Sequence, residues 1–64
     1  MRDSTRIPRI ISQLERCWLK APELRLGQLF ENLKSWAGKD DLFWMEDDEF
    51  ELLIQDFYNN FLKD

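Results

Sequence analysis

Acidic side chains gather in one stretch of the chain and are the first candidates for chemistry. Residues 40–51 hold seven of the thirteen carboxylates, and such a cluster could bind a divalent cation or a basic partner. An EF-hand loop that begins at Asp40 would need an oxygen ligand at its third and fifth positions and a glycine at its sixth. Leu42, Trp44 and Met45 occupy those positions. We therefore expect no metal site, and we expect most of these acids to cap a helix and offset its dipole.

The chain has one thiol and no imidazole, so the commonest general base and metal ligand is missing. Cys17 lies in an apolar repeat beside Trp18, with no histidine to form a thiolate pair. We predict a buried structural thiol, no enzymatic activity and no cofactor. One cysteine cannot form an internal disulfide, and the polar start of the chain has no apolar signal segment. The longest apolar run, Leu42–Met45, is far too short to span a membrane, so we expect a cytoplasmic protein.

Three tryptophans could form a stacking platform for nucleic acid bases, but their spacing favours packing. Trp18 and Trp36 share helical stripes with aliphatic residues. We predict that both lie in the core, because a domain of 64 residues needs their large apolar area. Trp44 lies outside both stripes, next to Phe43, in a connection too apolar to be fully solvated. We expect part of that connection to fold back over the core, and a partner contact remains open for Trp44.

Apolar residues repeat with helical spacing in three segments, so the predicted fold class is all-α. The repeats predict helices at about residues 8–20, 26–37 and 47–62. Pro8 suits a first turn, Pro22 ends the first helix, and Gly38 suits a left-handed cap of the second. No segment alternates as a strand would. We predict one domain over residues 1–64, built as a small three-helix bundle or an orthogonal three-helix array.

Two local patterns add detail to these helices. Asp48 and Glu51 have the spacing of a capping box at the start of the third helix. Gly27, near the start of the second helix, would allow another helix to approach closely. Leu19 and Leu52 lie opposite the apolar stripes of their helices, so we expect both side chains to be exposed.

The net charge of −4 is distributed unevenly along the chain. Residues 1–39 hold eight Lys and Arg against four Asp and Glu, whereas residues 40–64 hold one Lys against nine acids. We expect part of this opposite charge to cancel within the domain. On a helical wheel Arg9, Arg16 and Lys20 lie together, opposite the apolar stripe, which predicts a basic outer face on the first helix. The negative net charge argues against tight non-specific binding to nucleic acid but leaves open a local contact through basic residues.

Residues 6–18 read RIPRIISQLERCW, and the chain continues through LKA to PELRLGQLF at residues 22–30. The pattern begins with an Arg, an aliphatic residue and a helical repeat that ends in Trp. Three residues later come Pro and an acid, and then Leu, any residue, Leu, any residue and Gln. It resembles the small bacterial YihD-like proteins of uncharacterised function and related short proteins of bacteria and phages. Asp47 and Asp48 ahead of the third helix are a weaker match, and residues 33–46 do not align clearly. The resemblance implies an all-helical fold and a bacterial or phage origin, and it implies no activity or site.

The missing catalytic residues, the small size and the polarised charge favour binding over catalysis. We predict a small protein-binding module, such as a regulator or a phage-encoded inhibitor of a host factor, whose partner and oligomeric state the sequence leaves open. A nucleic-acid-associated regulator that uses the basic face of the first helix is one alternative. An acidic DNA mimic that uses residues 40–64 is another. The predicted contact residues surround the start of the third helix: Asp41, Phe43, Trp44, Glu46, Asp47 and Glu51.

Overall fold

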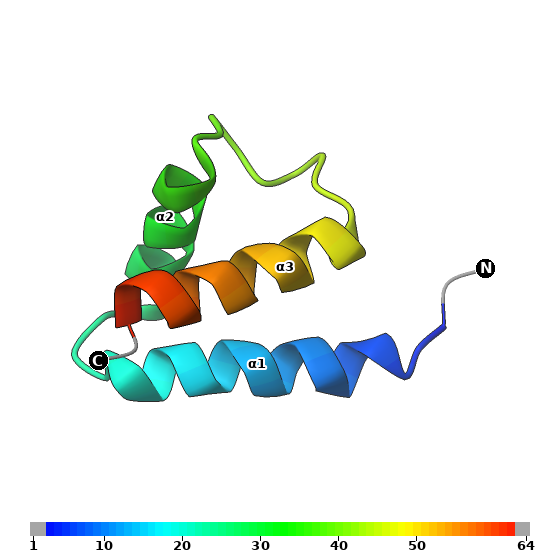
Figure 1. Cartoon of the computed structure of the whole chain (residues 1–64), viewed down its shortest axis with the longest axis horizontal. Helices are drawn as coiled ribbons and strands as arrows, with labels where there is room; N and C mark the ends of the chain where they lie inside the picture. The colour runs from blue at the N-terminus through cyan, green and yellow to red at the C-terminus, as the bar shows by residue number, and fades with distance from the viewer. Residues whose placement is uncertain (1–2, 63–64) are drawn as a thin grey trace.

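The third helix is the central element of the fold (Figure 1). The computed structural model describes residues 3–62, in which α1 (Arg6–Lys20), α2 (Leu26–Ala37) and α3 (Asp47–Phe57) are followed by a π-helical turn, η1 (Tyr58–Leu62). Helix α3 packs against both other helices, whereas α1 and α2 scarcely touch. In Figure 1, α1 and α3 run side by side in the same direction and α2 stands across them. The predicted all-α, three-helix fold is confirmed, and residues 3–62 contain no strand.

The helix ends follow the local signals closely. Helix α1 begins at Arg6, so Pro8 lies in its first turn, where a missing amide hydrogen costs no helical hydrogen bond. It ends at Lys20, just before Pro22. Gly38 adopts φ 69° in the left-handed region, and its N–H donates to the carbonyl oxygens of the last turn of α2. The predicted stop signals are therefore the ones that the chain uses.

The ends of α3 differ from the prediction in two ways. The capping residue is Glu46, whose backbone N–H donates to the Glu49 carboxylate at 3.3 Å, so the predicted capping box of Asp48 and Glu51 is wrong. The Glu51 side chain is instead turned toward α1. At the other end, α-helical geometry stops at Phe57 and the last turn through Leu62 is π-helical. The predicted helical span is correct, but its final turn is wound more widely than an α-helix.

Six buried residues form the core where the three helices meet: Cys17, Leu29, Leu33, Leu53, Ile54 and Phe57. Three of the six belong to α3, which agrees with its central position. The predicted burial of Cys17 is confirmed, because its side chain is fully enclosed. Desolvation in this core raises the pKa of the Cys17 thiol. The predicted close approach at Gly27 is wrong, since a Cβ atom there would meet nothing within 4 Å.

Trp18 and Trp36 lie at the rim of the core, so the prediction that both are core residues is wrong. Their residues are 36% and 38% exposed. The Trp18 indole N–H donates to the Leu24 carbonyl oxygen at 2.8 Å, and the Trp36 indole N–H donates to the Asp56 carboxylate at 2.7 Å. An indole ring carries a polar N–H that needs an acceptor, which favours a half-buried position over a wholly apolar one. The core is consequently smaller and more aliphatic than the sequence pattern indicates.

Candidate functional site

The connection between α2 and α3 carries the most exposed aromatic pair of the molecule. Phe43 and Trp44 are 80% and 81% exposed, and their rings meet edge to face with centroids 4.7 Å apart. We call this pair the aromatic tip. A turn closed by the Met45 N–H, which donates to the Leu42 carbonyl oxygen at 3.2 Å, accounts for its exposure. The two ends of the turn, Leu42 and Met45, pack on the core, and its two middle residues point outward.

The prediction that part of this connection folds back over the core is therefore confirmed. Leu42 folds back over the core as expected, whereas Phe43 and Trp44 do not. The Asp41 carboxylate accepts a hydrogen bond from the Phe43 N–H at 3.2 Å, a local contact typical of an Asp that starts a turn. This contact fixes the backbone that presents the aromatic tip.

Carboxylates surround one side of the aromatic tip. A depression of about 260 Å³ lies beside Trp44, and its lining residues are Lys39, Asp40, Asp41, Trp44, Met45 and Glu49. We call Asp40, Asp41 and Glu49 the acidic rim. An indole face beside several carboxylates is an arrangement that can hold a guanidinium or ammonium group through cation–π contact and charge-assisted hydrogen bonds. In residues 3–62 no three potential ligand side chains come close enough together to hold a metal ion.

Two of the predicted contact residues, Asp47 and Glu51, form ion pairs within the molecule instead. Asp47 accepts a hydrogen bond from the Arg6 Nε at 2.6 Å. Glu51 accepts two hydrogen bonds from the Arg9 guanidinium, at 2.8 and 2.6 Å, and a third from the Gln13 amide at 3.0 Å. The hydrogen bond from Arg9 lowers the pKa of Glu51, and the bond from Gln13 acts in the same direction. These two carboxylates join α3 to α1 and are not part of the acidic rim.

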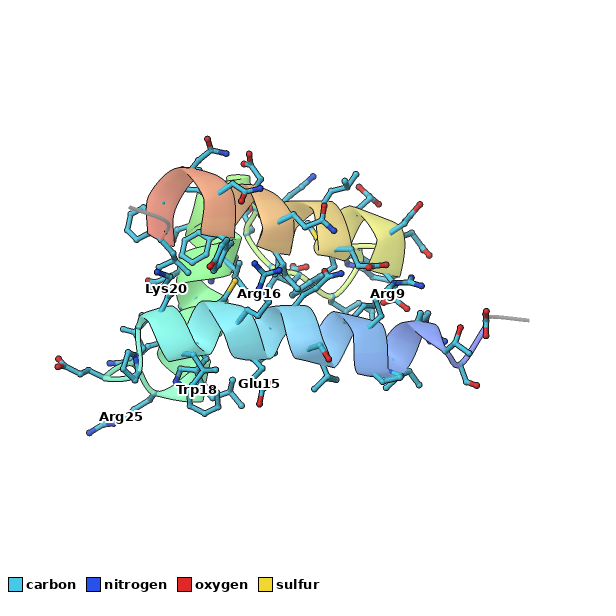
Figure 2. All side chains as sticks on the ribbon, turned by 60° about the horizontal axis from the view of Figure 1, so that its bottom comes forward. Arg9, Glu15, Arg16, Trp18, Lys20 and Arg25 are labelled. Atoms are coloured by element: carbon cyan, nitrogen blue, oxygen red, sulfur yellow. The ribbon has the colours of Figure 1, made fainter. Side chains whose placement is uncertain are left out.

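The basic residues of α1 are likewise turned toward α3, so the prediction of a basic outer face is wrong. Figure 2 shows Arg9, Arg16 and Lys20 on the side of α1 that faces α3 and η1. Arg9 pairs with Glu51, and the Arg16 guanidinium lies 4.7 Å from the centre of the Tyr58 ring. A helical wheel centred on the whole apolar stripe directs these residues outward, but the buried residue of α1 is Cys17, at one edge of that stripe. With Cys17 in the core, the helix is rotated so that Arg9 and Arg16 reach α3 and η1.

The structure thus places the six predicted contact residues at three different positions. Asp41, Phe43 and Trp44 gather at the end of the α2–α3 connection, whereas Asp47 and Glu51 face α1. Glu46 begins α3 as its capping residue. Asp40 and Glu49 also lie beside Trp44, and neither was among the predicted contact residues. The spacing of Glu46 and Glu49, which matches a capping box, could have indicated that Glu49 lies in the first turn of α3, close to the connection.

Comparisons with known proteins identified no relative of this chain. The chain matches no protein-family model, and no curated protein and no solved structure matches it significantly. The resemblance to YihD-like proteins therefore stays a prediction. Within residues 3–62, no helix combines the length and the apolar character that crossing a membrane requires.

Proposed function

We propose that this protein is a non-enzymatic binding module that holds a basic segment of another protein between its aromatic tip and its acidic rim. The observation that carries the proposal is the pair Phe43 and Trp44, which are about four-fifths exposed although a small domain gains stability by burying such rings. Exposed aromatic residues at one end of a molecule are typical of contact sites. A module of this kind would act as a regulator or an inhibitor of its partner.

The chemistry of the site indicates what the partner offers. Trp44 supplies one wall of the depression, and Asp40, Asp41 and Glu49 supply negative charge around it. An arginine or lysine side chain can lay its apolar stem on the indole and place its charge among the carboxylates. The negative field around the rim would also accelerate the approach of a basic surface, so association should slow as the salt concentration rises.

A pull-down with paired variants tests the proposal. The native chain and the Phe43→Ser/Trp44→Ser variant are immobilised side by side, and proteins retained from the source cell are identified by mass spectrometry. Leu52→Ser is the matched control, because Leu52 is a comparably exposed apolar residue on the outer side of α3. We expect a basic partner to be retained by the native chain and by Leu52→Ser and to be lost with the double variant. Equal retention by all three would contradict the proposal.

A charge variant tests the acidic rim separately from the aromatic tip. Asp41→Asn keeps a side-chain oxygen that can accept the hydrogen bond from Phe43 but removes the negative charge. We expect the association rate to fall and its salt dependence to become shallower, with an unchanged circular dichroism spectrum. If Asp41→Asn associates as fast as the native chain at low salt, the acidic rim is not part of the binding site.

The two alternative functions make different predictions for the same protein. A nucleic-acid-associated regulator would need the basic residues of α1, but Arg9 and Arg16 already contact α3 and η1, which leaves that alternative with less support. Retention on DNA at low salt that Lys20→Glu abolishes would favour it. A DNA mimic would use the same acids as our proposal, so displacement of the captured partner by DNA would favour the mimic.

A further inference from the structure

The depression beside Trp44 offers one aromatic surface, and this limits the kind of cation that it suits. Among the described residues that line it, Trp44 is the one aromatic residue. The Phe43 ring meets Trp44 edge to face but does not belong to the lining. Sites that bind methylated lysine enclose the ammonium within several aromatic rings. A single indole face instead suits a flat cation that can stack on it.

Two carboxylates of the acidic rim are oriented by backbone N–H groups. Oδ1 of Asp41 accepts from the Phe43 N–H at 3.2 Å, and Oε1 of Glu49 accepts from the Glu46 N–H at 3.3 Å. Within residues 3–62 nothing donates a hydrogen bond to Oδ2 of Asp41 or to Oε2 of Glu49. Each carboxylate is thus held by the fold and keeps an oxygen that can accept from a bound group.

The charges around the depression favour a single cation. The lining holds the carboxylates of Asp40, Asp41 and Glu49 and the ammonium of Lys39, which gives a formal charge of −2. Asp41 belongs to the α2–α3 connection, whereas Glu49 belongs to the first turn of α3. A cation on the indole therefore meets acceptors from two separate elements, and its own positive charge leaves the site negative.

We propose that the side chain held at this site is an arginine of the partner, selected over lysine. This inference rests on the proposed function, because it names the residue that the partner places between the aromatic tip and the acidic rim. A guanidinium is planar and has five N–H donors, so its face stacks on the Trp44 indole while its edge donates to Asp41 and Glu49. Its methylene groups lie along Met45, which also lines the depression.

A lysine side chain makes a weaker set of contacts at the same place. Its ammonium is a compact and strongly hydrated charge, whereas a guanidinium is more weakly hydrated. Trp44 is 81% exposed, so the site does not remove the ammonium from water. An ammonium also has no plane that can stack on the indole. We therefore expect arginine to bind at least ~5-fold more tightly than lysine.

Titration of the full chain with short capped peptides tests this selectivity. The probes are acetyl-glycyl-X-glycine amides in which X is arginine, lysine or trimethyllysine. The readout is the indole N–H signal of Trp44 in proton–nitrogen NMR spectra, which Trp44→Phe assigns. The indole N–H groups of Trp18 and Trp36 donate to protein oxygens and serve as internal controls. We expect a dissociation constant on the order of 1 mM for the arginine probe and values at least ~5-fold higher for the other two.

Matched charge variants test whether the acidic rim provides the selectivity. Glu49→Gln keeps an oxygen that can accept from Glu46 and loses the charge, so the arginine probe should bind ~3-fold more weakly and with a smaller advantage over lysine. Glu31→Gln removes the same charge from α2, outside the depression, and should change neither affinity. Lys39→Gln removes a positive charge from the lining and should tighten the arginine probe ~2-fold. Circular dichroism confirms that the variants fold.

Four results would overturn the assignment of arginine. The arginine and lysine probes could bind equally well. The trimethyllysine probe could bind most tightly, which would indicate an aromatic cage. The Trp44 signal could stay unshifted at ~10 mM of the arginine probe, a concentration well above the expected dissociation constant. Glu31→Gln could weaken binding as much as Glu49→Gln does, which would indicate attraction to the net charge alone.

The peptide titration and the pull-down fail in different ways. Partner capture that the Phe43→Ser/Trp44→Ser variant loses, together with equal affinity for arginine and lysine, would support the proposed function and overturn the assignment of arginine. An arginine-selective shift of the Trp44 signal, with no basic partner retained from the source cell, would contradict the proposed function alone.

Discussion

At the scale of single residues, stability is concentrated in a few aliphatic and aromatic side chains. Phe57 is almost completely buried and contacts both Trp36 and Phe61, whereas Trp36 is more than one-third exposed. We expect Phe57→Ala to cost about 3 to 5 kcal/mol, which is comparable with the whole stability of a domain this small. Trp36→Phe keeps the ring contacts and loses the hydrogen bond to Asp56, so we expect a cost of about 1 kcal/mol. Urea unfolding of both variants checks this order, and a larger loss for Trp36→Phe would contradict it.

The thiol of Cys17 is protected by two separate features. The residue is fully enclosed, and its pKa is raised because burial disfavours the thiolate, the form that reacts. We expect a thiol reagent at pH 8 to modify the folded chain at least ~100-fold more slowly than the chain in urea. If the folded chain were modified as fast as the chain in urea, the core would have to open freely around α1.

At the scale of helices, the charged contacts between α1 and α3 make stability depend on pH. Arg9 lowers the pKa of Glu51 below its ordinary value of 4.5 in the folded chain. Between the folded and the unfolded pKa the unfolded chain binds more protons, so this contribution is present above about pH 4.5 and is lost as the pH falls through the folded pKa. Glu51→Gln should flatten the fall of the melting temperature as the pH is lowered below about 4.5. Parallel pH curves for Glu51→Gln and the native chain would contradict this role.

The turn after α2 depends on a backbone conformation that only glycine adopts without strain. Gly38 has φ 69°, and a Cβ atom at this position would meet no neighbour, so any cost of substitution comes from the backbone alone. We expect Gly38→Ala to destabilise the fold by about 1 kcal/mol and Gly27→Ala, inside α2, to stabilise it by up to about 1 kcal/mol. Chemical unfolding of the two variants checks these opposite signs.

At the scale of the whole molecule, the ion pairs that join the helices and the proposed partner site use different residues. The prediction that opposite charges partly cancel is confirmed, since Arg6 and Arg9 pair with Asp47 and Glu51. The aromatic tip takes part in neither of these pairs and is largely exposed. We therefore expect Phe43→Ser/Trp44→Ser to change the free energy of unfolding by less than about 0.5 kcal/mol while it abolishes partner capture. Thermal unfolding measured beside the pull-down checks this separation, and a strongly destabilised variant would show that the tip supports the fold.

The sequence by itself determined the three helices, most of their ends and the burial of Cys17. These features follow from local properties: the spacing of apolar residues, the restricted backbone of Pro8 and Pro22, and the left-handed cap at Gly38.

Only the tertiary structure decided which side of α1 enters the core and which acids of α3 face α1. The apolar stripe of α1 is wider than the surface that α3 can cover, so packing between distant segments decides that Cys17 enters the core while Ile7, Ile11 and Trp18 stay at least one-third exposed. The same choice brings Arg9 to Glu51. Such contacts join residues about forty positions apart, and no local pattern in the chain specifies them.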